Sequence, residues 1–152
     1  ALSSAASDVY KRQPLILGGI VGFITSKTMD YETLSKPPLS PPGIIFPIVW
    51  SILYTLMGIS FARLEINNLH DNETKKVYYE QLIVNLSWPI FFFTFKWRLF
   101  SILIILLLLI LVIRMIRVFY RKEKLAGLLQ IPYLLWVSFA TYLNISTYFL
   151  NN

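Results

Sequence analysis

Apolar residues along this chain gather into five segments separated by short polar or charged stretches. The segments cover about residues 14–25, 44–62, 77–95, 99–113 and 125–150. A helix needs about 20 apolar residues to cross the hydrocarbon core of a bilayer, and the second, third and fifth segments come close to that length or exceed it. No residue from Ile102 to Val112 is polar, which excludes the alternating pattern of a transmembrane β-barrel. The pattern therefore predicts an all-α integral membrane bundle of five transmembrane helices.

The first apolar segment is too short to cross a bilayer as a helix. The residues before it are small and polar, and the codons of residues 8–13 can match a transposase end sequence used in DNA library preparation. We therefore expect residues 1–13 to be non-native or a disordered N-terminus, and the first helix to be N-terminally truncated. Residues 14–152 would then form one five-helix transmembrane domain.

A proline-rich stretch, residues 36–43, lies between the first and second apolar segments and holds four of the eight prolines. Proline fixes φ and has no N–H, so this stretch is excluded from a helix interior. A stiff loop that leads directly into an apolar helix is expected to hold a defined shape, as the lid or wall of a binding site.

Composition supports a membrane protein and excludes several other classes. Hydrophobic residues make up 56% of the chain and charged residues 14%, against about 45–50% and about 25% in soluble domains. The net charge of +6 does not indicate nucleic-acid binding, because the basic residues flank the apolar segments. The chain has no cysteine and one histidine, His70, in a polar loop. We therefore predict no metal site.

Lysine and arginine counts near the segment ends predict the orientation in a bacterial cell membrane. The loops after the second and fourth segments hold eight of these residues, and the loops on the opposite side hold four. The side with more lysine and arginine is usually cytoplasmic. Loop 26–43 and the C-terminus are therefore expected on the outer side.

Three of the apolar segments carry aromatic and polar residues at spacings of three and four, which place them on one face of a helix. These faces consist of Pro47, Trp50, Tyr54 and Met57 in the second segment, Gln81, Asn85 and Trp88 in the third, and Tyr133, Trp136, Ala140 and Asn144 in the fifth. Three such faces together would line an aromatic cavity with a few polar groups. A cavity of that kind suits a large, flat, mostly apolar ligand.

Simpler explanations exist for the same residues. Asn85, considered by itself, is more simply explained as a side chain that hydrogen-bonds to a neighbouring helix. Trp50, Trp88 and Trp136 match the aromatic belt of membrane proteins, although Trp97 beside two basic residues fits a belt position better.

Proline and glycine positions also have two readings. Pro89 either kinks the third helix around a cavity or is a tolerated packing kink. The pair Gly18 and Gly22 serves either dimerisation or close packing within one chain, and we favour the second.

Four stretches, 36–43, 46–58, 81–88 and 132–144, together resemble the TspO/MBR family. These are the tryptophan-rich sensory proteins, related to the mitochondrial translocator protein or peripheral-type benzodiazepine receptor. The resemblance implies a five-helix bundle, usually homodimeric, that binds porphyrins, haem and other tetrapyrroles and requires no cofactor. It also implies that the first loop caps the pocket.

By this resemblance and the helical faces, nine residues are expected to bind the ligand. They are Tyr31, Pro47, Trp50, Tyr54, Asn85, Trp88, Tyr133, Trp136 and Ala140. Asp30 and Ile44 stand where the family usually has aromatic residues. No basic residue follows Tyr142 or Tyr148, so sterol binding by the family's C-terminal pattern is not predicted.

The leading functional hypothesis is a tetrapyrrole-binding sensor or translocator in the lipid bilayer. One alternative is an enzyme that degrades porphyrin with light and oxygen, for which the resemblance makes Trp50 and Trp136 the candidate catalytic residues. A second alternative is a passive small-molecule transporter.

Overall fold

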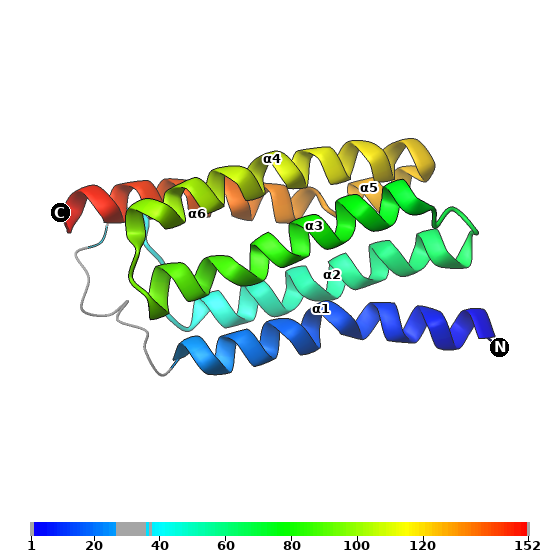
Figure 1. Cartoon of the computed structure of the whole chain (residues 1–152), viewed down its shortest axis with the longest axis horizontal. Helices are drawn as coiled ribbons and strands as arrows, with labels where there is room; N and C mark the ends of the chain where they lie inside the picture. The colour runs from blue at the N-terminus through cyan, green and yellow to red at the C-terminus, as the bar shows by residue number, and fades with distance from the viewer. Residues whose placement is uncertain (1, 27–35, 37, 152) are drawn as a thin grey trace.

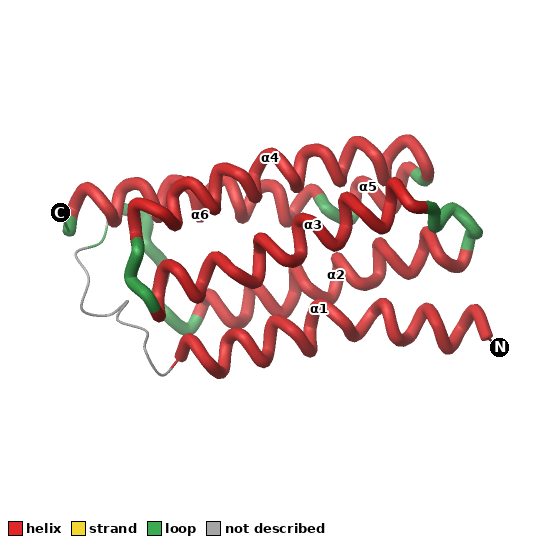
Figure 2. Tube along the Cα trace, viewed as in Figure 1, coloured by secondary structure: helices red, strands yellow, loops and turns green. Residues whose placement is uncertain are grey.

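The computed structural model describes residues 2–26, 36 and 38–151, and over these residues the chain is helical, with short connections (Figures 1 and 2). The elements in chain order are α1 (Leu2–Ser26), α2 (Ile45–Ile66), α3 (Asn72–Pro89), the π-helical turn η2 (Ile90–Thr94), α4 (Arg98–Lys122), α5 (Lys124–Leu128) and α6 (Ile131–Leu150).

The long helices lie side by side in a bundle whose connections gather at its two ends (Figure 1). The α2–α3 and α4–α5 turns lie at one end, and the η2–α4 turn and the end of α6 lie at the other. Within the described residues, α2, α4 and the stretch Lys124–Leu150 are long and apolar enough to cross a membrane. The all-α bundle expected from the sequence is confirmed.

The start of α3 is set by a reciprocal pair of hydrogen bonds. The Asp71 carboxylate accepts from the Thr74 N–H, and the Thr74 hydroxyl accepts from the Asp71 N–H, each over 2.9 Å. This capping box pairs backbone donors that the first turn of a helix leaves open. The helix therefore begins at Asn72, earlier than the start near Val77 that apolar character alone predicted.

The helices differ from the apolar segments of the sequence at three other places. The fourth helix continues past residue 113 to Lys122, because arginine and lysine favour helix even where the apolar run has ended. The third segment is not one α-helix, because α3 ends at Pro89 and a π-helical turn follows. The fifth segment is divided after Leu128, and Pro132 lies in the first turn of α6, where a missing N–H costs nothing.

The first helix is longer than expected. Residues 2–13, which we expected to be non-native or disordered, are helical and continuous with residues 14–26. Whether residues 1–13 are native stays a prediction. α1 packs closely on α2: a Cβ on Gly58 would lie 2.3 Å from the Lys11 carbonyl oxygen, and one on Gly18 would lie 2.2 Å from the Tyr54 ring. Of the pair Gly18 and Gly22, Gly18 therefore packs closely within the chain, whereas a Cβ on Gly22 would meet no heavy atom within 4 Å.

The half of the bundle near the α2–α3 turn is filled by aromatic side chains. Phe61, Tyr78 and Phe119 are fully buried. The ring centroids of Phe61 and Tyr78 are 3.8 Å apart, and Phe119 stacks on both at 6.3 Å. Packing of this kind from α2, α3 and α4 holds the helices together at one end and leaves the other end to form a cavity.

Candidate ligand-binding cavity

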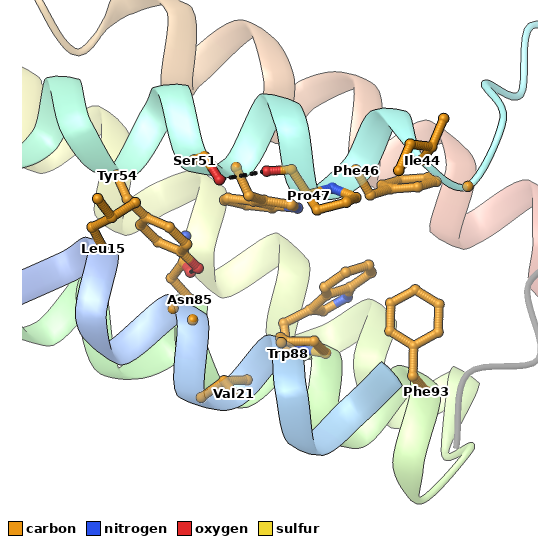
Figure 3. Close-up of a pocket in the computed structure, with 16 residues that line it drawn as sticks. Leu15, Val21, Ile44, Phe46, Pro47, Ser51, Tyr54, Asn85, Trp88 and Phe93 are labelled. Atoms are coloured by element: carbon orange, nitrogen blue, oxygen red, sulfur yellow. Dashed lines mark hydrogen bonds between the residues drawn. The ribbon is translucent and has the colours of Figure 1, made fainter. Parts of the chain in front are cut away.

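A cavity of about 760 Å³ lies between α1, α2 and the end of α3 (Figure 3). Its walls consist of Leu15, Gly18, Gly19, Val21 and Gly22 from α1, Gly43, Ile44, Phe46, Pro47, Trp50, Ser51 and Tyr54 from the start of α2 and the residues before it, and Asn85, Trp88, Pro89 and Phe93 from α3 and η2. Ligand sites in proteins commonly enclose about 300–1,000 Å³.

The α1 wall was missed by the sequence analysis. Leu15, Gly18, Gly19 and Gly22 recur at spacings of three and four, so they share one face of the helix. A Cβ on Gly19 or Gly22 would meet no heavy atom within 4 Å, which shows that these two glycines border open space. A hydrophobic pattern gives no signal for glycine. The spacing of four between Gly18 and Gly22 was the feature of the sequence that indicated a distinct face of this helix.

The α2 wall carries the predicted aromatic face. Pro47, Trp50 and Tyr54 all line the cavity, and the rings of Trp50 and Tyr54 stack with centroids 5.5 Å apart. Ser51 donates a hydrogen bond to the Pro47 carbonyl over 2.7 Å, drawn as the dashed line in Figure 3. The fourth member of the face, Met57, lies beyond the cavity and is fully buried.

A chain of buried hydrogen bonds closes one end of the cavity. The Tyr54 hydroxyl donates to Asn85 Oδ1 over 2.5 Å, and Asn85 Nδ2 donates to the Tyr133 hydroxyl over 2.7 Å. The Tyr133 hydroxyl in turn donates to Gln81 Oε1 over 2.7 Å. Asn85 thus both joins helices and lines the cavity, so the two readings of this residue hold together.

Trp88 faces the cavity from the opposite wall, near Phe93 (Figure 3). It is buried, and its indole N–H donates to Asn144 Oδ1 over 2.8 Å. Asn144 also donates to the Ser101 hydroxyl over 3.2 Å. These bonds tie α3 to α6 and α4 and fix the indole plane, so Trp88 does not occupy a belt position. Pro89, where α3 ends, borders the same space.

The predicted residues of α6 stand behind the cavity and do not line it. The Trp136 indole packs edge-on against Trp50, with centroids 6.3 Å apart, and against Phe46 at 5.8 Å. Tyr133 holds Asn85 from behind, and Ala140 is buried. The fifth segment therefore supports the aromatic wall of α2. Tyr31 and Asp30 lie outside the described residues.

The end of the proline-rich stretch reaches the cavity. Gly43 and Ile44 are part of its wall, and the Tyr142 hydroxyl of α6 donates to the Pro38 carbonyl over 2.7 Å. Leu39 has φ of 71°, which bends the chain between these contacts. These contacts are consistent with the stretch forming part of a site wall.

The described walls of the cavity are mostly apolar and aromatic, with a few polar groups. None of the described wall residues carries a charge, and the polar groups are those of Ser51, Tyr54, Asn85 and Trp88. Among the described residues no cluster of histidine, aspartate or glutamate could hold a metal ion. The aromatic rings supply stacking surface, and Tyr54 with Asn85 supplies hydrogen bonding at one end.

Known proteins resemble this chain over most of its length. The profile of the TspO/MBR family matches residues 13–150. The chain belongs to the TspO/MBR family. The tryptophan-rich protein TspO of Chlorobaculum tepidum is 40% identical over 124 residues, which cover 80% of this chain and 78% of that protein. Protein CrtK of Rhodobacter capsulatus is 35% identical, over 88% of this chain and 85% of that protein.

The similarity extends to an animal protein of the same family. The human translocator protein is 32% identical over 122 residues, which cover 75% of this chain and 70% of that protein. This chain is therefore a TspO/MBR membrane protein of the sensor and translocator family. Its cavity is built from α1, α2 and α3, with α6 as the support.

Proposed function

We propose that this TspO/MBR protein binds a tetrapyrrole, such as a porphyrin or haem, in the cavity between α1, α2 and α3, and acts as its sensor or translocator. The observation that carries the proposal is the pairing of two indoles, Trp50 and Trp88, on opposite walls of one cavity whose described wall residues carry no charge. A planar aromatic ligand between them would stack or pack edge-to-face on either side.

The volume and the polar groups support the same class of ligand. The cavity of about 760 Å³ suits a molecule of drug size or larger. Tyr54 and Asn85 lie at one end, where they can exchange hydrogen bonds with a polar group on the ligand edge. Relatives at 32% and 40% identity are named translocator protein and tryptophan-rich protein TspO, which agrees with a role in sensing or moving a small molecule.

Titration of the purified full chain with protoporphyrin tests this function. The Trp50→Phe variant should weaken binding by about fivefold, because a smaller ring offers less stacking surface in the cavity wall. Trp97→Phe is the matched control, because Trp97 is 56% exposed and outside the cavity. Equal affinity of the two variants would place the porphyrin elsewhere.

Photochemical porphyrin degradation is a second candidate, favoured by the contact between Trp50 and Trp136. Trp50 lines the cavity and Trp136 lies directly behind it, with ring centroids 6.3 Å apart. An excited porphyrin could accept one electron from Trp50, and Trp136 could reduce the Trp50 radical cation that is left. The reduced porphyrin would pass its electron to oxygen, the co-substrate that then oxidises the macrocycle. Illumination of the complex should then bleach the porphyrin faster than free porphyrin, and Trp136→Phe should slow the bleaching without weakening binding in the dark.

We also propose that the proline-rich stretch and the C-terminus face the outside of the cell. Arg63 lies in the last turn of α2, and Arg121 and Lys122 lie in the last turn of α4, so they belong to the end of the bundle with the α2–α3 and α4–α5 turns (Figure 1). Lys96 lies between η2 and α4, and Arg98 is the first residue of α4, at the opposite end (Figure 1). The richer end, beside the α2–α3 and α4–α5 turns, would be cytoplasmic.

A further inference from the structure

A second cavity, of about 580 Å³, opens on the surface of the bundle beside the turn between η2 and α4. Among the described residues it shares no wall residue with the larger cavity. The turn contributes Lys96 and Trp97, and the first turns of α4 contribute Arg98, Leu99, Phe100 and Leu103. The end of α6 completes the wall.

The charged side chains among the described wall residues of this cavity are positive. Lys96 and Arg98 are part of the wall, and none of the other described wall residues carries a charge. No ion pair in the part of the chain that the structure describes involves Lys96. The carboxylates of Asp71 and Glu123 form their ion pairs near the opposite end of the bundle (Figure 1). The cavity is therefore suited to an anionic group.

The turn holds both cations in place. Lys96 has φ of 57°, and the N–H of Trp97 donates to the Phe91 carbonyl over 2.9 Å. The guanidinium carbon of Arg98 lies 5.2 Å from the centroid of the Phe92 ring, a cation–π contact. Trp97 itself stacks on Phe91 with centroids 5.7 Å apart. The positive groups thus project from a folded turn and not from a loose loop.

The apolar part of the cavity continues from the turn along α4. Leu99 and Leu103 are 58% and 61% exposed, and their spacing of four places them on one face of a helix that can span the membrane. Trp97, 56% exposed beside two basic residues, marks the level of the lipid headgroups. The cavity therefore has a cationic part at headgroup level and an apolar part that runs toward the bilayer interior.

We propose that this cavity binds one anionic phospholipid, with its phosphate between Lys96 and Arg98 and an acyl chain along Leu99 and Leu103. The charge of the wall matches the phosphate, and the leucine face matches the chain. This site is independent of the tetrapyrrole cavity, so its test does not depend on the proposed function.

Native mass spectrometry of the full chain, titrated with phosphatidylglycerol and with phosphatidylcholine of the same acyl chains, tests the proposal. Phosphatidylglycerol should bind more tightly. Lys96→Asn should weaken its binding by about fivefold, the effect of one basic residue at an anionic surface. Asparagine suits this position because it tolerates the left-handed backbone. Lys124→Asn, which removes an exposed lysine at the other end of the bundle, is the matched control and should change nothing.

Three results would overturn the proposal. Equal binding of the two lipids would show a general apolar contact with the bilayer. An equal effect of Lys96→Asn and Lys124→Asn would show that net charge alone attracts the lipid. If millimolar inorganic phosphate displaced bound phosphatidylglycerol as effectively as added phosphatidylglycerol does, the site would be assigned to free phosphate. Leu103→Glu provides a second variant, and it should weaken phosphatidylglycerol binding while leaving protoporphyrin affinity unchanged.

Discussion

The hydroxyl of Tyr54 lies 2.5 Å from Oδ1 of Asn85 and donates a hydrogen bond to it. This bond joins α2 to α3 at the point where the cavity ends. The Asn85 side-chain N–H also donates a hydrogen bond to the Tyr133 hydroxyl of α6. One buried amide therefore connects three helices and presents its edge to the cavity. Stability and ligand binding are expected to depend on the same side chain.

Replacement of Asn85 by alanine should destabilise the bundle by about 1–2 kcal/mol, because the hydroxyls of Tyr54 and Tyr133 lose their shared partner. Ser87→Ala is the control on the same helix, since Ser87 donates only to the Val84 carbonyl of its own helix. Unfolding in detergent, followed by circular dichroism, gives both values. Equal stability of the two variants would contradict the role given to Asn85.

Two adjacent glycines of α1 should respond differently to alanine. Gly18→Ala brings a methyl group within 2.2 Å of the Tyr54 ring and should cost about 1–3 kcal/mol of stability, the usual effect of overpacking. Gly19→Ala meets open space and should be neutral or slightly stabilising, because alanine favours helix. Thermal unfolding of both variants measures the difference, and a Gly19→Ala variant as unstable as Gly18→Ala would show that α1 lies elsewhere.

The stability of the α2–α3 turn should depend on acid pH. The hydrogen bond from Lys122, followed by that from the Thr74 N–H, lowers the pKa of Asp71 from 3.8 to about 2. An acid with a lower pKa in the folded state stabilises the fold above its unfolded pKa, and this contribution is lost as the pH falls from about 4 to about 2. Unfolding midpoints over this range should fall more steeply for the natural chain than for Asp71→Asn. If the unfolding midpoints of the two proteins fell equally with pH, the stabilising role given to the Asp71 carboxylate would be refuted.

The proposed orientation can be tested with single cysteines, because the chain has none. In intact cells a membrane-impermeant maleimide should label Pro42→Cys in the proline-rich stretch and leave Asn72→Cys at the start of α3 unlabelled. Both positions are exposed, so access to the thiol is matched. The reverse labelling pattern would place the proline-rich stretch in the cytoplasm.

Periodicity predicted the inward faces of the helices well. Trp50, Tyr54, Asn85 and Trp88 all line the cavity, because spacings of three and four along an apolar helix leave only one side for polar and aromatic groups. The same spacing did not distinguish a residue that lines the cavity from one that packs behind the cavity wall. Trp136 repeats the pattern, yet it packs behind Trp50.

Boundaries and the α1 wall were less predictable from sequence. The apolar run stops at residue 113, but α4 reaches Lys122 because helix formation does not depend on hydrophobicity. Gly19 and Gly22 contribute to the cavity because glycine has no side chain to fill the space beside α1. That space exists only when α2 is packed beside α1. A cavity wall made of glycines can therefore be recognised in the tertiary structure but not in the pattern of apolar residues.

Filling the cavity from α1 tests the central claim most directly. Gly22→Phe places a ring in the space that the ligand would occupy. Ile20→Phe adds a ring at a position that is 54% exposed and is not among the described wall residues of the cavity. Protoporphyrin titration of both variants, after circular dichroism has confirmed their helix content, should show affinity lowered by about tenfold or more for Gly22→Phe and unchanged for Ile20→Phe. Undiminished affinity in a folded Gly22→Phe protein would contradict the assignment of this cavity as the tetrapyrrole site.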